Sequence, residues 1–160
     1  MRCVVYCGVS IDGYIADRDG GLAWLDSVPN PDHDDMGWNA FMAGIDVLVM
    51  GRKTFETVCA FDGDWPYTKP VCVLSESLTT LPAGYEDKAF LLRGTPEAIQ
   101  QDLADRGYGH CYIDGGQCIQ RYLQADLIDE MILSTLPLLL GGGIPLFGEH
   151  AKALSFEHVR

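Results

Sequence analysis

The residues best suited to chemistry lie where an apolar segment gives way to glycine, two cations and a hydroxyl. The apolar run 47–50 is followed directly by Gly51, Arg52, Lys53 and Thr54. Where a strand ends and a helix begins, free backbone N–H groups and the positive end of the helix dipole attract anions. Arg52 could form a forked contact with a terminal phosphate, and Thr54 could donate a further hydrogen bond. The segment predicts a phosphate-binding junction, although the same residues also suit an ordinary solvated helix start.

A second junction of this kind follows the apolar run 111–113. There Asp114 precedes the pair Gly115 and Gly116, and glycine lets the backbone approach a ligand or a helix closely. A diphosphate could rest on the amides of the residues that follow, which are Gln117, Cys118 and Ile119. A lone glycine pair is more typical of a tight turn, but the two junctions together favour a binding site for a phosphate-bearing ligand.

Strands that alternate with helices are needed to hold these junctions. Short apolar runs predict strands at residues 3–9, 47–50, 71–74, 89–92, 111–113 and 131–136. Helices are expected at residues 34–43, 54–59 and 117–124. A further helix is predicted to begin after Thr95 with Pro96 in its first turn and to end at Gly107. This alternation indicates an α/β fold with a largely parallel sheet.

Length, composition and charge exclude several classes of protein. With 160 residues, 48% of them apolar and 21% charged, the chain suits a single α/β domain over residues 1–160. No apolar stretch is long enough to cross a bilayer, and the first residues predict a strand rather than a signal peptide, so we expect a cytoplasmic location. The net charge of -12 argues against nucleic acid and membrane surfaces as partners.

The remaining reactive side chains do not form recognisable centres. Most of the six cysteines lie in apolar runs without a C-x-x-C pair, which predicts buried, reduced thiols. The four histidines have no carboxylate or cysteine partners at ligand spacing, so no metal is expected. No nucleophile-elbow pattern occurs, which disfavours hydrolase chemistry.

The order of the segments resembles the dihydrofolate reductase family and, more closely, its relatives that include the reductase domain of riboflavin biosynthesis. The resemblance rests on VSIDGYIA at 9–16, MGRKTF at 50–55, DGG at 114–116, LIDE at 127–130 and LPLLLGGGIPLF at 136–147. It implies a three-layer α/β/α fold like that of dihydrofolate reductase, with a mostly parallel central sheet and an antiparallel C-terminal strand. It also implies NAD(P)H-dependent reduction of a small heterocyclic substrate. A non-catalytic dinucleotide- or pterin-binding module of the same fold is the alternative.

The resemblance further implies that NADPH lies across the carboxyl ends of the strands, with its phosphates at the two junctions. Its other contacts would come from Gly8, Ile15, Leu74 and Ser75. A cis peptide bond between the paired glycines and a mobile loop over residues 14–24 are also implied. Glu76 follows Ser75 and would repel the adenosine phosphate of NADPH, so NADH is not excluded.

For the substrate, the resemblance implies contacts with Val9, Trp24 and Trp38. Residues 24–51 contain no Lys or Arg but five aspartates, so a neutral or cationic heterocycle is favoured over an anionic one. The proton that accompanies hydride transfer is expected from Asp35, as a buried carboxyl with a raised pKa, or from Asp12. Asp35 could equally be a structural cap at a helix start.

A homodimer is predicted from the apolar run 131–140, which leaves surface to be covered. Related reductases continue past a segment like 156–160 into one more strand, so we expect a sheet edge that is open or completed by a partner.

Overall fold

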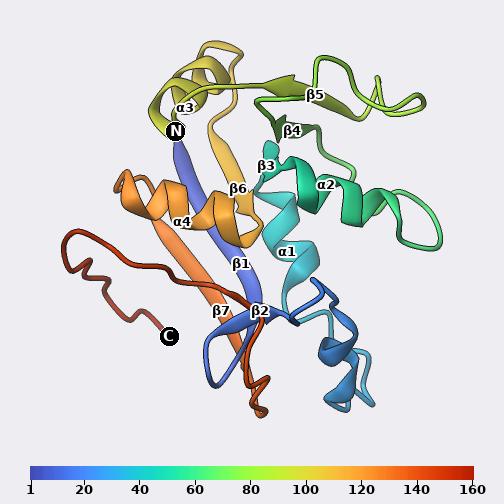
Figure 1. Ribbon diagram of the computed structural model, residues 1–160, viewed down its shortest axis with the longest axis vertical. Helices are drawn as coiled ribbons and strands as arrows, with labels where there is room; N and C mark the ends of the chain where they lie inside the picture. The colour runs from blue at the N-terminus through green and yellow to red at the C-terminus, as the bar shows by residue number, and fades with distance from the viewer.

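The computed structural model describes residues 1–160 and has a six-stranded parallel sheet at its centre, in the order β5-β4-β3-β6-β1-β7 (Figure 1). The strands are β1 (Arg2–Ser10), β3 (Val47–Gly51), β4 (Val71–Leu74), β5 (Ala89–Leu92), β6 (His110–Asp114) and β7 (Glu130–Leu136). The central strands are continuous apolar runs because both faces of a parallel sheet are covered. All six strands predicted from apolar runs are confirmed.

Helices cover the two faces of this sheet. They are α1 (Trp38–Ala43), α2 (Arg52–Cys59), α3 (Pro96–Asp105) and α4 (Gly116–Gln124), with a short 3-10 helix η1 (Ala23–Ser27). Ile99 of α3 and Ile119 of α4 belong to one core cluster, whereas Met42 of α1 and Phe55 of α2 belong to the other. The helices therefore pack in pairs on opposite faces, which confirms the predicted three-layer α/β/α architecture.

Helix α3 begins and ends as its sequence predicts. The side chain of Thr95 accepts a hydrogen bond from the backbone N–H of Ala98 at 3.3 Å, and Pro96 occupies the first turn. Gly107 follows the C-cap with a φ of 92°, a left-handed conformation that suits glycine.

The antiparallel pairing lies outside the main sheet. Strand β7 runs parallel to β1 over seven residue pairs, from Val4 opposite Glu130 to Ser10 opposite Leu136. The antiparallel strand implied near the C-terminus is β8 (Ile144–Pro145), which pairs with β2 (Tyr14–Ala16) in a separate two-stranded sheet. Strand β2 and the first two residues of helix η1 lie in the segment 14–24, which was expected to be a mobile loop.

Helix α1 is shorter than the helix predicted over residues 34–43. Met36 and Gly37 have positive φ angles of 55° and 84°, which a right-handed helix cannot accommodate. The chain turns there instead, and the helix begins at Trp38.

Strand β7 forms one edge of the sheet, and no strand pairs with its outer side. The segment after β8 returns past β7 and α4, where Leu154 packs against the core (Figure 1). All six cysteines are free thiols. None of the helices combines the length and the apolar character needed to span a membrane.

Candidate functional site

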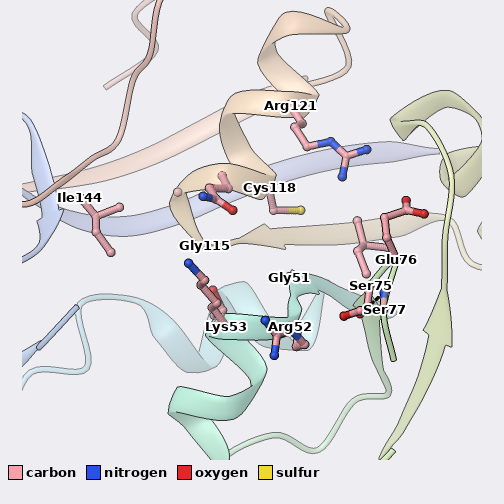
Figure 2. Close-up of a pocket in the computed structure, with 14 residues that line it drawn as sticks. Gly51, Arg52, Lys53, Ser75, Glu76, Ser77, Gly115, Cys118, Arg121 and Ile144 are labelled. Carbon is pink, nitrogen blue, oxygen red and sulfur yellow. Dashed lines mark hydrogen bonds between the residues drawn. The ribbon is translucent and has the colours of Figure 1, made fainter. Parts of the chain in front are cut away.

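A cleft of about 440 Å³ opens at the carboxyl ends of β3, β4 and β6 (Figure 2). It is lined by residues 51–54 where β3 ends, by 74–77 where β4 ends, by 115–118 at the start of α4, and by Arg121 and Ile144. Parallel strands end at the same edge of a sheet, so the two junctions found in the sequence lie side by side. Every residue expected at the phosphates of a cofactor, apart from Ile119, lines this cleft.

Close packing explains both glycines of the second junction, Gly115 and Gly116. Gly115 has a φ of 87°, and a Cβ atom at this position would overlap the hydroxyl of Thr54 on α2. A Cβ atom on Gly116 would lie 2.9 Å from the side chain of Ile144. The structure has no cis peptide bond, so the cis bond expected between Gly115 and Gly116 is wrong. The positive φ of Gly115 turns the chain from β6 into α4 instead.

The cleft is positively charged, unlike the chain as a whole. Its lining includes three cations, Arg52, Lys53 and Arg121, and one acid, Glu76, in a chain whose formal net charge is -12. Figure 2 shows Arg52 and Lys53 on the α2 side and Arg121 on the α4 side, with Glu76 at the end of β4 beside them. This local excess of positive charge suits a ligand that carries several phosphates.

Arg121 was missed by sequence reasoning. It lies four residues after Gln117, and residues four apart on a helix share one face, so this spacing could have identified it. Its guanidinium donates a hydrogen bond of 3.1 Å to the carbonyl of Gly94. This bond holds the arginine side chain at the cleft and leaves further N–H donors for a ligand.

A second cleft of about 590 Å³ adjoins the first and has a mostly apolar lining. Both clefts are lined by Lys53, Thr54, Gly115, Gly116 and Ile144, so a ligand could extend from one into the other. The second cleft contains Gly8, Ile15, Trp38 and Ile119 among the residues expected at the site, and Leu74 and Ser75 line the first.

Four expected site residues line neither cleft: Val9, Asp12, Trp24 and Asp35. Val9 and Trp24 are buried, with 6% and 9% of their surface exposed. Val9 belongs to the core cluster between the sheet and helices α3 and α4. The structure therefore does not bring these residues together with the glycine junctions.

Asp35 is exposed at the surface turn before α1. Its carboxylate accepts hydrogen bonds from the backbone N–H groups of Asn39 at 3.0 Å and Gly37 at 2.8 Å. These bonds stabilise the charged form and lower the pKa of Asp35, with the bond from Asn39 contributing most. The expectation of a buried carboxyl with a raised pKa at this position is wrong, because the turn keeps Asp35 at the surface.

Asp12 also has a lowered pKa, and its hydrogen-bond partners connect two segments of the fold. Ser10 donates a hydrogen bond of 2.6 Å to its carboxylate, and this bond is the largest cause of the lowered pKa. The backbone N–H groups of Leu140 and Gly141 donate two more, at 3.0 and 2.7 Å. Asp12 therefore connects the turn after β1 to the loop before β8.

Asp114 and Asp19 are the carboxyl groups that line the second cleft, and only Asp114 has a raised pKa; sequence reasoning gave Asp114 no role in catalysis. Burial among its neighbours raises its pKa, although the backbone N–H of Gly115 donates a hydrogen bond of 2.9 Å that acts in the opposite direction. The same burial, together with Asp114, raises the pKa of the adjacent Cys7 thiol to about 12. Asp114 follows the buried Tyr112 by two residues on β6, and this strand alternation could have indicated that its side chain points inward.

Comparison with known proteins identifies relatives that match nearly the whole chain. The sequence matches the model of the RibD C-terminal domain over residues 3–160. It is 31% identical over 150 residues to the uncharacterized protein YwjB of Bacillus subtilis, a match that covers 92% of this chain and 83% of YwjB. A crystal structure from Shewanella sp. PV-4, of a protein whose name refers to riboflavin biosynthesis, is 52% identical with a TM-score of 0.96, and the match covers 100% of this chain and 90% of that one.

More distant structures share the fold. The Thermotoga maritima diaminohydroxyphosphoribosylaminopyrimidine deaminase/5-amino-6-(5-phosphoribosylamino)uracil reductase is 14% identical with a TM-score of 0.71, over 98% of this chain and 50% of that chain. Dihydrofolate reductase from Enterococcus faecalis, in a complex with NADP(H), is 18% identical with a TM-score of 0.63, over 94% and 79% of the two chains. These likenesses confirm the expected dihydrofolate-reductase-like fold, and the match of the family model over nearly the whole chain shows that this protein belongs to the RibD C-terminal domain family.

Proposed function

We propose that this protein is a reductase that uses a nicotinamide dinucleotide, preferably NADPH, to reduce a small heterocyclic substrate. The main support is the continuity between a positively charged, glycine-lined cleft and an apolar pocket that contains a carboxyl group with a raised pKa. Its relation to reductases such as those named above agrees with this proposal.

The first cleft has the chemistry that a dinucleotide needs. Backbone N–H groups at the start of α2 and α4, with Lys53 and Thr54, would hold the diphosphate. Arg52 and Arg121 would face the adenosine phosphate of NADPH from two sides. Glu76 weakens this preference, since its carboxylate lies in the same lining and would repel the phosphate. NADH is therefore a weaker alternative cofactor.

The second cleft would hold the group that is reduced. When bound, the cofactor supplies a hydride, which carries two electrons, to one carbon of a carbon–nitrogen double bond. The ring nitrogen must then receive one proton. Asp114 is the carboxyl group that lines this cleft with a raised pKa, so it holds a proton to a higher pH than an exposed aspartate does. We assign the proton to Asp114, which either donates it or orients a water molecule that does.

Calorimetric titration with NADPH and with NADH tests the cofactor part of the proposal. We expect binding of both, with NADPH the tighter. Loss of reduced-nicotinamide absorbance in a screen of pteridines, pyrimidinones and small imines then tests catalysis. Binding without turnover of any compound would favour the non-catalytic module of the same fold, and no binding of either cofactor would refute the proposal.

A further inference from the structure

We infer that Tyr67 is a further residue of the reaction site, and that its hydroxyl donates a hydrogen bond to the substrate beside the atom that Asp114 protonates. This inference rests on the proposed function and adds a residue to the same site. It is supported by the position of Tyr67 in the second cleft, by its unpaired hydroxyl, and by the aromatic contacts that hold its ring.

Tyr67 comes from a segment to which the sequence analysis gave no function. It follows Pro66 in the connection between α2 and β4, and its half-buried side chain lines the second cleft together with Asp114. Burial raises the pKa of the Tyr67 hydroxyl, and the negative charge of Asp114 raises it further. The phenol and the carboxyl group therefore lie close enough to influence each other, and one ligand could contact both.

The second cleft is lined by three tyrosines, and two of their hydroxyls are already used. Tyr6 donates a hydrogen bond of 2.8 Å to the carbonyl of Met36, and Tyr112 donates one of 3.0 Å to the carbonyl of Tyr6. The hydroxyl of Tyr67 has no partner within the protein, and its oxygen is accessible, unlike that of Tyr122, which is buried without a partner. Since a tyrosine hydroxyl in a partly buried position usually finds a partner, this one is available to a ligand.

Aromatic packing fixes the direction in which this hydroxyl points. The ring of Tyr67 lies edge to face against Trp65, with ring centroids 5.4 Å apart. Trp65 in turn contacts Tyr85 at 5.3 Å and the fully buried Phe55 of α2 at 6.0 Å in the same manner. Because these contacts involve the ring and not the hydroxyl, Tyr67→Phe should leave the fold intact.

The chemistry of the phenol suits a donor that keeps its proton. Its raised pKa leaves it protonated at physiological pH, so Tyr67 donates a hydrogen bond and does not act as a base. In the proposed reaction the carbon of the carbon–nitrogen double bond gains the hydride, which leaves the cofactor oxidised. The ring nitrogen gains the proton of Asp114, whose carboxylate is then reprotonated by water. A hydrogen bond from Tyr67 to a neighbouring acceptor would orient the double bond and draw electrons from it, which favours addition of the hydride.

The test uses quinoxaline and naphthalene, two planar probes of the same shape, of which only quinoxaline has ring nitrogens that accept hydrogen bonds. Binding is measured by ligand-observed NMR in protein saturated with NADP⁺. In Tyr67→Phe we expect quinoxaline to bind about threefold to tenfold more weakly than in the parent protein, as for the loss of one neutral hydrogen bond, and naphthalene to bind equally well. Unchanged binding of quinoxaline in the variant would overturn the inference, and so would its failure to bind to the parent protein.

Tyr6→Phe is the matched control, because it removes from the same cleft a hydroxyl that is already bonded to the backbone. It should leave the binding of both probes unchanged. A carboxyl NMR titration should give the same pKa for Asp114 in Tyr67→Phe as in the parent protein, since Tyr67 acts on the substrate and not on the acid. A clear shift of that pKa would contradict the inference, because Tyr67 would then act through Asp114.

Kinetics separate this inference from the proposed function. With a compound that the parent protein reduces, Tyr67→Phe should lower kcat/KM about threefold to tenfold, and the pH at which kcat falls should not move. An unchanged kcat/KM would overturn the role of Tyr67 alone. If NADP⁺ does not bind to the parent protein, the proposed function itself fails.

Discussion

The backbone N–H of Gly141 donates a hydrogen bond of 2.7 Å to the carboxylate of Asp12, which lies 129 residues earlier in the chain. This contact fixes the loop before β8 on the turn after β1. Strands β2 and β8 flank these two segments and line the clefts through Ile15 and Ile144. Asp12 therefore helps to position the lining of the clefts, although its own side chain does not belong to that lining.

We predict that Asp12→Ala lowers Tm by a few degrees near neutral pH. The lowered pKa of Asp12 sets the sign of the pH dependence: the bonds stabilise the fold above the ordinary pKa of an aspartate, and this stability is lost as pH falls through the lowered value. Differential scanning calorimetry of both proteins should therefore show the difference in Tm shrinking as the pH is lowered. A difference that persists unchanged in strong acid would show that the charge of Asp12 is not its cause.

Asp114→Asn should lower kcat for an identified substrate by about a hundredfold or more while the affinity for NADPH stays unchanged. A proton donor acts only while protonated, so the kcat of the parent protein should fall as pH rises through the raised pKa of Asp114. The variant should lose this dependence. A carboxyl NMR titration supplies a check that needs no substrate, and a titration of Asp114 at the pKa of an exposed aspartate would contradict the assignment.

Arg52→Ala and Arg121→Ala should each weaken the binding of NADPH about tenfold and weaken the binding of NADH much less. A charge-assisted hydrogen bond contributes about 1.5–3 kcal/mol, and solvent around the partly exposed Arg52 reduces that value. Glu76→Gln should strengthen the binding of NADPH, because it removes a negative charge that repels the adenosine phosphate. Arg106→Ala, at the C-cap of α3 and outside both clefts, is the control. Equal losses for the two cofactors would show that neither cleft arginine contacts the adenosine phosphate.

Gly115→Ala should destabilise the protein more than Gly107→Ala does. Both glycines have positive φ, which costs alanine about 1–2 kcal/mol, but a Cβ atom at Gly107 has open space around it. At Gly115 the overlap with Thr54 adds strain, for a total of about 2–5 kcal/mol. Urea denaturation measures both variants, and equal losses would mean that α2 moves aside at little cost.

We predict a homodimer that covers the outer side of β7, where no strand is paired. Ile132 is half-buried and packs against neither core cluster, so Ile132→Lys should weaken the dimer without disturbing the core. Sedimentation velocity at micromolar concentration should show a dimer for the parent protein and a larger monomer fraction for the variant. A monomeric parent protein would refute the prediction.

Local signals predicted the sheet and the charged junctions well. Buried runs such as those of β3 and β4 contain little except apolar residues, and the two glycine junctions follow strands directly in the chain. Helix α1 was predicted too long because nothing in the apolar pattern reveals that Met36 has a positive φ. Strand β2 is only three residues long and pairs with residues more than a hundred positions later, so no local pattern marks it.

The charged residues of the site were harder to predict, because a pKa depends on neighbours that the sequence does not place. Asp35 was expected to be buried, yet a turn with two backbone N–H groups keeps it ionised at the surface. Asp114 precedes Gly115 in a motif that the sequence analysis identified, but its burial could not be predicted. That burial depends on side chains that the fold brings around it, such as Cys7 of β1 and Tyr67 of the segment before β4.

The position of β1 in the sheet affects how the protein is made in a cell. Its two partners in the sheet, β6 and β7, lie more than a hundred residues later, as the contact between Cys3 and Cys111 across 108 positions illustrates. At typical rates of translation, β1 waits on the order of ten seconds before either partner has been synthesised. During that time its apolar residues are open to aggregation, and the long loops that must close make folding slow. Synthesis of this protein should therefore depend on chaperones that shield the first strand of the nascent chain.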